Sequence, residues 1–160
     1  MRVRELGRRI TGDYQGRRLL VVGILNGAFI FMADLIRQID LPVELDFLRV
    51  SSYGGGKSSS GTLKFTKDIE LPVEGKDVLL VEDIVDTGLT IFRLTEILLE
   101  RKADSVRTCV LIDKRERREH SVHLDYTGFV VEQGFLVGYG LDCDEQLRQL
   151  PGVYRLAEGE

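Results

Sequence analysis

Three short runs of almost entirely apolar residues constrain the fold of this chain most. They are Leu19 to Leu25 (LLVVGIL), Asp77 to Val81 (DVLLV) and Cys109 to Ile112 (CVLI). Each run is too short for most helices, and continuous apolar character is typical of a strand buried on both faces. Such strands occur in parallel sheets with helices on both sides, so the runs predict an α/β protein.

Segments with helical spacing of apolar residues alternate with these runs. They predict helices over residues 3–14, from Phe29 to Ile39, and over residues 91–101. Asn26-Gly27 is a frequent hairpin turn, but the residues after it do not alternate, so it is interpreted as a strand–turn–helix connection. Further strands are expected at residues 43–53, 62–69, 105–112, 129–131 and 135–137. The predicted architecture is a central, mainly parallel sheet flanked by helices.

Residues 54–61, GGGKSSSG, form the single low-complexity stretch. Glycine and serine make such a segment flexible, as in an interdomain linker. Too few residues precede it for an independent domain, so a mobile loop is the better interpretation. A length of 160 residues is typical of one domain, here residues 1–160.

An acidic segment, VEDIVDTGLT, follows the second apolar run. Glu82 and Asp83 come directly after the strand expected at residues 77–81, and Asp86 and Thr87 precede a helix. In open α/β sheets, ligands bind outside the carboxyl ends of the strands. The backbone N–H groups at a helix start suit a phosphate, and carboxylates beside them can accept hydrogen bonds from sugar hydroxyls or bind Mg²⁺.

A purely structural explanation of this segment is that Asp86 and Thr87 cap the helix. Capping accounts for one acidic residue. It does not account for Glu82 and Asp83, whose desolvation costs free energy unless they face a ligand or an ion. A Walker A loop, GxxxxGK[ST], is absent, and Gly23 and Gly27 are spaced wrongly for GxGxxG.

Composition excludes several classes of protein. The chain has 22 basic and 26 acidic side chains, a net charge of −4, which disfavours a nucleic-acid binder with a wide basic face. No apolar run approaches the roughly 18 residues of a membrane span, and the N-terminus lacks a signal-peptide core. Two cysteines, Cys109 and Cys143, do not make a zinc site or a disulfide framework. A cytoplasmic protein with no membrane partner is therefore expected.

The acidic segment resembles the phosphoribosyl pyrophosphate loop of type I phosphoribosyltransferases, above all in its Asp-Thr-Gly-x-Thr ending. Four further blocks, in family order, resemble the hypoxanthine-guanine branch of bacterial type. They are Gly23 to Leu35 (GILNGAFIFMADL), Phe47 to Tyr53, Leu111 to Lys114 (LIDK) and Phe135 to Asp142 (FLVGYGLD). The resemblance implies the type I phosphoribosyltransferase fold, with a small hood from the C-terminal part and a flexible lid at residues 54–61.

The resemblance also implies roles for individual residues. Glu82 and Asp83 would contact the ribose hydroxyls, and Asp86 would be the candidate general base near N7 of the purine. Thr87, Gly88, Leu89 and Thr90 would hold the 5′-phosphate. Ser52 and Tyr53 would belong to the lid, which keeps water from an oxocarbenium-like state.

The purine would be recognised by Lys114 at its 6-oxo group, by stacking on Phe135, and by the backbone of Leu136. From spacing alone, ordinary core is the favoured interpretation of Phe135, and the charged turn of residues 115–118 is interpreted as solvated.

Pyrophosphate would be held by Asn26, Gly27 and Arg148, and Mg²⁺ by Asp142, with Glu82 and Asp83 as further metal ligands. Many relatives have lysine at the position of Asn26, so this chain lacks one positive charge there.

The resemblance implies an enzyme of purine salvage. It would use Mg²⁺ to convert hypoxanthine or guanine and phosphoribosyl pyrophosphate to IMP or GMP and pyrophosphate, as a homodimer or homotetramer. Two alternatives stay open. One is a regulator of the same fold that binds nucleic acid, which the net charge disfavours. The other is a xanthine-preferring phosphoribosyltransferase, because the sequence does not rank hypoxanthine, guanine and xanthine.

Overall fold

The computed structural model describes residues 1–52 and 63–157 of the chain. Tyr53 and the expected lid at residues 54–61 lie outside the described residues. Three helices are described, α1 (Arg2–Asp13), α2 (Phe29–Ile36) and α3 (Leu89–Glu100). The strands are β1 (Leu19–Ile24), β2 (Val43–Ser52), β3 (Leu63–Lys67), β4 (Asp77–Val85), β5 (Ser105–Lys114), β6 (Tyr126–Val131), β7 (Leu136–Val137) and β8 (Tyr154–Arg155).

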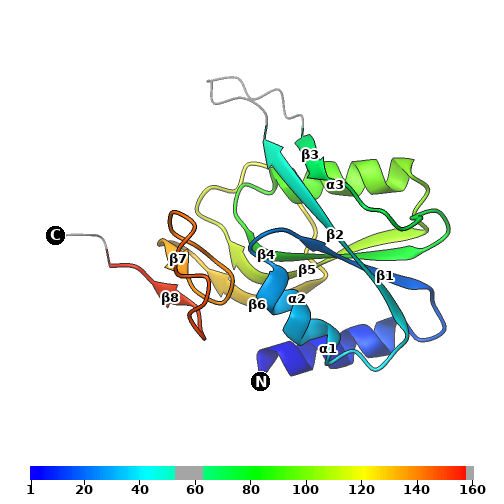
Figure 1. Cartoon of the computed structure of the whole chain (residues 1–160), viewed down its shortest axis with the longest axis horizontal. Coiled ribbons are helices and arrows are strands. Elements are labelled where there is room, and N and C mark those ends of the chain that lie inside the picture. Colours follow the sequence, from blue (N-terminus) through cyan, green and yellow to red (C-terminus); the bar gives the residue numbers. More distant parts are fainter. Residues whose placement is uncertain (53–62, 158–160) are drawn as a thin grey trace.

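Six strands form one sheet in the order β3-β2-β1-β4-β5-β6 (Figure 1). All neighbours in it are parallel except β2 and β3, so the predicted, mainly parallel α/β sheet is confirmed. The chain builds outward from β1 through β2 to β3, then crosses to β4 on the other side of β1. The order therefore reverses between β1 and β4, where open α/β sheets bind ligands.

Helices cover both faces of this sheet, which explains why the central strands are apolar throughout. All six residues of β1 are buried. Successive strand residues point to opposite faces, so Val21, Leu79 and Val81 join the core under α1 and α2. Leu20, Val78 and Leu80 join a second core under α3. Burying a Val or Leu side chain contributes about 1.5–3 kcal/mol, so the two cores together stabilise the sheet.

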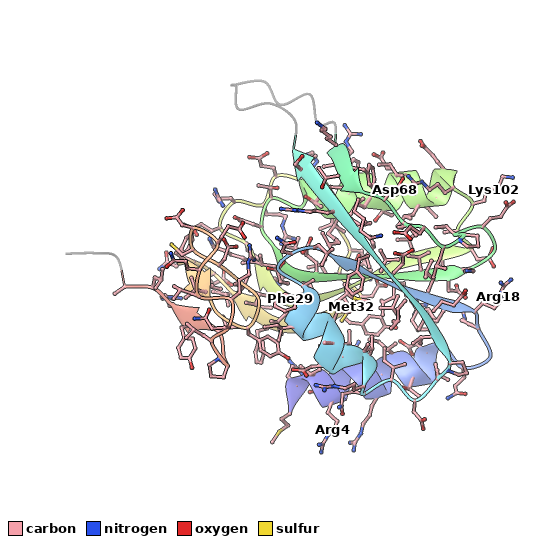
Figure 2. All side chains as sticks on the ribbon, viewed as in Figure 1. Arg4, Arg18, Phe29, Met32, Asp68 and Lys102 are labelled. Atoms are coloured by element: carbon pink, nitrogen blue, oxygen red, sulfur yellow. The ribbon has the colours of Figure 1, made fainter. Side chains whose placement is uncertain are left out.

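The three helices confirm the expected ones, with small shifts at their ends. In α1, Leu6 and Ile10 are fully buried, as their spacing predicts. In α2, Met32 is directed at the sheet and is buried. Arg18 and Lys102 lie at the opposite end of the molecule from β7 and β8 (Figure 2). None of the helices in the described ranges is long and apolar enough to cross a bilayer.

The C-terminal part, residues 132–157, lies outside the main sheet and is called the hood segment here. It contains the two-stranded antiparallel sheet of β7 and β8, beside β6 and α2 (Figure 1). Tyr139 Oη donates a hydrogen bond to Asp34 Oδ2 of α2, at 2.5 Å. The hood segment is thus attached to α2, the helix that follows β1.

Candidate active site

The site begins at the point where β4 continues beyond the last residue that pairs with β1. That pairing ends at Gly23 and Val81, whereas β4 stays paired to β5 as far as Val85 and Asp113. Glu82 and Asp83 therefore lie inside β4, and the expectation that they follow the strand is wrong. Both carboxylates still occupy the part of β4 that has left β1, at the switch point of the sheet.

Glu82 and Asp83 are both buried. Burial, together with the negative charge of Asp83, raises the pKa of Glu82 well above its ordinary value. Glu82 lines a cavity of about 150 Å³ with Asp86, Thr87, Gly88 and Thr90. Two adjacent buried carboxylates are costly without a cation or donor beside them, so this pair is typical of a ligand site.

The Asp86–Thr90 loop connects β4 to the N-terminus of α3. Gly88 has φ of +85°, and a Cβ there would lie 2.6 Å from the backbone oxygen of His120. Glycine is therefore required at this turn for both conformation and space. The loop leaves the first N–H groups of α3 and the positive end of its dipole facing the cavity, which suits a phosphate.

Asp86, the candidate general base, forms an ion pair with Arg117. Its Oδ2 accepts hydrogen bonds from both Nε and Nη2 of Arg117, the Nε bond being 2.9 Å. Its Oδ1 is buried and has no hydrogen-bond partner among the described residues. An unsatisfied buried carboxylate oxygen is costly, and a donor on a ligand would relieve that cost.

Lys114 ends β5 beside a second cavity, of about 680 Å³, which Lys114 and Phe135 line together. Lys114 Nζ lies 3.0 Å from Glu116 Oε2, and its side chain is largely buried. Phe135 is 55% exposed, so the interpretation of this residue as ordinary core is wrong. An exposed aromatic ring beside a buried amine can stack on a planar base and donate to its oxygen. Leu136, in β7, is half-buried next to them.

The hood segment brings Asp142 and Arg148 together. Arg148 Nη1 lies 2.9 Å from Asp142 Oδ1 and donates to the backbone oxygen of Gly140 at 2.8 Å. Gly140 itself packs against Gly27, whose backbone oxygen would be 2.1 Å from a Cβ at position 140. The peptide bond between Leu25 and Asn26, which leads into this turn, is cis. Asn26, Gly27, Asp142 and Arg148 thus form one region beside Asp83.

The turn of residues 115–118 is not simply solvated, as the sequence suggested. Arg117 binds Asp86, and Arg118 is largely buried and donates to Val85, Asp86, Asp113 and Lys114. The run of charged residues at 115–118 has no pattern that would predict contacts for Arg117 and Arg118 different from those of Arg115. A basic residue directly after a buried strand is a signal that identifies Lys114, but it does not extend to Arg117 and Arg118, which lie further along the turn.

The carboxylates fit Mg²⁺ only if other ligands complete the site. Across residues 1–52 and 63–157, no group of three or more His, Cys, Asp or Glu could hold a metal ion. Glu82, Asp83 and Asp142 therefore do not form a closed protein site. Mg²⁺ usually binds one or two carboxylates together with waters and substrate phosphates, and these residues fit that open arrangement.

Comparisons with known proteins identify the family of the chain. A family model, the phosphoribosyl transferase domain, matches residues 1–144. The chain is 49% identical to the hypoxanthine-guanine phosphoribosyltransferase of Aquifex aeolicus over 158 residues, covering 98% of this chain and 89% of the relative. It is 51% identical to the bifunctional protein TilS/HprT of Listeria innocua over 152 residues, covering 95% of this chain but only 24% of that protein's length.

A solved structure extends the comparison to the fold. The crystal structure of a hypoxanthine phosphoribosyltransferase from Staphylococcus aureus superposes with a TM-score of 0.93 at 44% identity, covering 98% of this chain and 85% of that one. The fold is therefore that of type I phosphoribosyltransferases. The chain belongs to the hypoxanthine-guanine phosphoribosyltransferase family of purine-salvage enzymes.

Proposed function

We propose that this chain transfers the 5-phosphoribosyl group from phosphoribosyl pyrophosphate to N9 of hypoxanthine or guanine, giving IMP or GMP and pyrophosphate. One observation carries the proposal. Three sets of residues meet at one edge of the sheet: the Asp86–Thr90 loop at the start of α3, the Lys114–Phe135 cavity, and the Gly27–Arg148 region. They match the phosphate, base and pyrophosphate of the two substrates in number and in chemistry.

In this proposal each set binds one part of the substrates. Thr87, Gly88, Leu89 and Thr90 hold the 5′-phosphate with backbone N–H groups and hydroxyls, and Glu82 and Asp83 bind the ribose hydroxyls. Lys114 donates to the 6-oxo group, Phe135 stacks on the ring, and the backbone of Leu136 meets the base edge. Asn26, Gly27 and Arg148 bind pyrophosphate. Arg148 exchanges its bond to Asp142 for a bond to a phosphate oxygen, which is also anionic.

The chemistry follows from this arrangement. The bond between C1′ and the pyrophosphate oxygen breaks, the bond between C1′ and N9 forms, and pyrophosphate leaves with the electron pair. The purine loses one proton, which Asp86 accepts at Oδ1, the oxygen that has no hydrogen-bond partner among the described residues. Burial of the ribose keeps water from the oxocarbenium-like state.

Mg²⁺ belongs to the proposal as a cofactor bound together with the substrate. Asp142, Glu82 and Asp83 would hold it with phosphate and hydroxyl oxygens, and it would neutralise charge on the leaving pyrophosphate. Backbone N–H groups at the turn of Asn26 supply part of what a lysine side chain would give there.

Several further features are proposed with the activity. Residues 1–160 act as one domain, residues 52–61 act as its lid, and residues 132–157 act as its hood. The protein works in the cytoplasm as a homodimer or homotetramer, without nucleic acid or membrane as a partner. The net charge of −4 supports the absence of an extended polyanionic partner.

The test is to incubate the protein with phosphoribosyl pyrophosphate, Mg²⁺ and one of four bases: hypoxanthine, guanine, xanthine or adenine. IMP and GMP should form, and adenine should give much less product. Chelation of Mg²⁺ by EDTA should stop the reaction, and added Mg²⁺ should restore it. Faster conversion of xanthine than of hypoxanthine would make the protein a xanthine-preferring enzyme, and no turnover of any base would contradict the proposal.

A further inference from the structure

Arg118 joins two strand ends that carry different parts of the site. Its Nε donates to the backbone oxygen of Asp86 at 2.8 Å, and its Nη2 donates to the backbone oxygen of Val85 at 3.0 Å, both at the end of β4. The same Nη2 donates to Asp113 Oδ1 at 2.5 Å and to the backbone oxygen of Lys114 at 3.1 Å, both at the end of β5. One guanidinium therefore bridges β4 and β5.

The bridge lies where these two strands separate. Their pairing ends at Val85 and Asp113, after which Asp86 enters the loop to α3, whereas Lys114 continues beside Val131 of β6. Beyond that point no strand pairing fixes the distance between Asp86 and Lys114. Arg118 supplies the hydrogen bonds that fix it, and its side chain is only 21% exposed.

The phosphate loop has a second attachment that does not depend on Arg118. The backbone oxygen of Thr87 accepts hydrogen bonds from the N–H groups of Glu119 and His120, at 3.0 and 2.9 Å. Removing the Arg118 side chain would therefore leave the loop attached. What it would remove is the direct connection between Asp86 and Lys114.

We infer that Arg118 is a positioning residue that sets the separation between the phosphoribosyl-binding loop and the purine-binding lysine. This inference rests on the proposed function of those two segments. A ligand that occupies both segments, such as IMP, depends on their separation, whereas phosphoribosyl pyrophosphate alone does not. The rate of transfer depends on the separation most, because a misplacement of about 1 Å can cost about 100-fold in rate.

Lysine should not replace Arg118 in this role. The guanidinium donates from two nitrogens in a fixed plane, to acceptors on both strands, whereas an ammonium is a single point on a flexible stem. Arg118→Lys keeps the charge and most of the volume, so it separates the geometry of the bridge from electrostatics.

The experiment measures three quantities in the wild type, Arg118→Ala, Arg118→Lys and Arg115→Ala. They are the Kd of IMP, the Kd of phosphoribosyl pyrophosphate with Mg²⁺, and the single-turnover rate of IMP formation. Arg115 is a matched control, because it lies on the same turn and its Nε donates to the same Asp113 carboxylate at 3.1 Å, yet none of its hydrogen bonds with described residues reaches β4.

Both Arg118 variants should weaken IMP binding at least about 10-fold and slow the single turnover by about 100-fold, with phosphoribosyl pyrophosphate affinity within about 3-fold of wild type. Added guanidinium should restore part of the rate of Arg118→Ala. Arg115→Ala should stay within about 3-fold of wild type in all three quantities, since the Arg115 side chain is largely exposed and its ion pair with Asp113 stays within β5 and its own turn.

Any of three binding or rate results would overturn the inference: unchanged IMP affinity and rate, an equal loss of affinity for IMP and phosphoribosyl pyrophosphate, or the same losses in Arg115→Ala. Loss of the fold in both Arg118 variants, seen by circular dichroism, would also overturn it by making Arg118 a stability residue. A wild-type protein that makes no IMP would instead contradict the proposed function, which keeps the two failures distinct.

Discussion

The carboxylate of Asp83 packs directly against the α-carbon of Gly27, so closely that a Cβ at position 27 would lie 1.9 Å from Oδ2. A residue of the turn that follows β1 and a residue inside β4 are thus in contact across the switch point of the sheet. A hydrogen atom at Gly27 is the largest substituent that this contact allows. The same glycine also packs against Gly140 of the hood segment.

Gly27→Ala should therefore damage the pyrophosphate side of the site. Displacing the buried Asp83 carboxylate should lower the free energy of unfolding by about 1–3 kcal/mol and reduce kcat/KM for phosphoribosyl pyrophosphate at least about 10-fold. Gly12→Ala, on the exposed side of α1 where a Cβ meets nothing within 4 Å, is the control and should raise stability by about 1 kcal/mol. Unchanged kcat/KM in Gly27→Ala would contradict this prediction, because it would show that displacing Asp83 does not affect the use of phosphoribosyl pyrophosphate.

Asp86→Asn tests the proposed proton acceptor. The amide cannot accept the purine proton, so kcat should fall by about 10²- to 10⁴-fold, with little change in KM for phosphoribosyl pyrophosphate. Arg117→Gln removes the same ion pair but keeps the carboxylate, and should change kcat only a few-fold. Equal losses in kcat and in substrate affinity in Asp86→Asn would make Asp86 a binding residue.

Lys114→Ala should relax the preference for 6-oxopurines. Loss of a charged hydrogen-bond donor should lower kcat/KM for hypoxanthine about 10- to 100-fold, whereas the low rate with adenine should change little. Glu116→Gln, which removes the carboxylate 3.0 Å from Lys114 Nζ, should preserve discrimination against adenine. If Lys114→Ala discriminates between the two bases as the wild type does, the 6-oxo group is recognised elsewhere.

Asp46 should make stability depend on pH. Burial opposes its ionisation, but N–H donors from Leu71, Phe47 and Glu70, with the Lys67 ammonium, lower its pKa below the ordinary value. A carboxyl whose pKa is lower in the folded state stabilises the fold above the unfolded-state pKa. That contribution is lost as pH falls through the folded-state pKa.

Asp46→Asn should accordingly lower the free energy of unfolding by about 1–3 kcal/mol at pH 7, measured by urea denaturation. The difference between variant and wild type should shrink below about pH 4, where the wild-type carboxyl also becomes neutral. Glu70→Gln, whose carboxylate is exposed and pairs only with Lys67 among the described residues, should cost less than about 1 kcal/mol at any pH. A constant difference across the pH range would contradict the assignment.

The central sheet was predictable because burial on both faces leaves an unmistakable apolar run in β1, and most of one in β4 and β5. The position of Glu82 and Asp83 inside β4 was not. The length of a strand depends on its partner, and Glu82 pairs with Val110, which lies in a different segment. Sequence patterns report local periodicity, whereas this pairing is set by the neighbouring strand.

The residues of the candidate site also fall into a group that the sequence predicts and a group that it does not. Residues that follow a buried strand, such as Asp86 and Lys114, could be identified because the carboxyl ends of parallel strands meet at one edge. The contacts of Arg117 and Arg118 depend on the path of the turn that carries them. The bond between Asp142 and Arg148 spans a turn in which Asp144, Glu145 and Leu147 adopt positive φ. These residue types do not predict a positive φ at three positions of one turn.

The contact of Gly140 with Gly27, and of Gly27 with Asp83, joins the last, first and middle thirds of the chain. During synthesis on the ribosome, the first two can meet long before the third has emerged from the exit tunnel. A nascent chain can therefore complete its six-stranded sheet, which ends at Val131, before Gly140 and Arg148 of the pyrophosphate region have emerged. Because such non-local contacts close late, competence to bind substrate should be the final property that a folding molecule acquires.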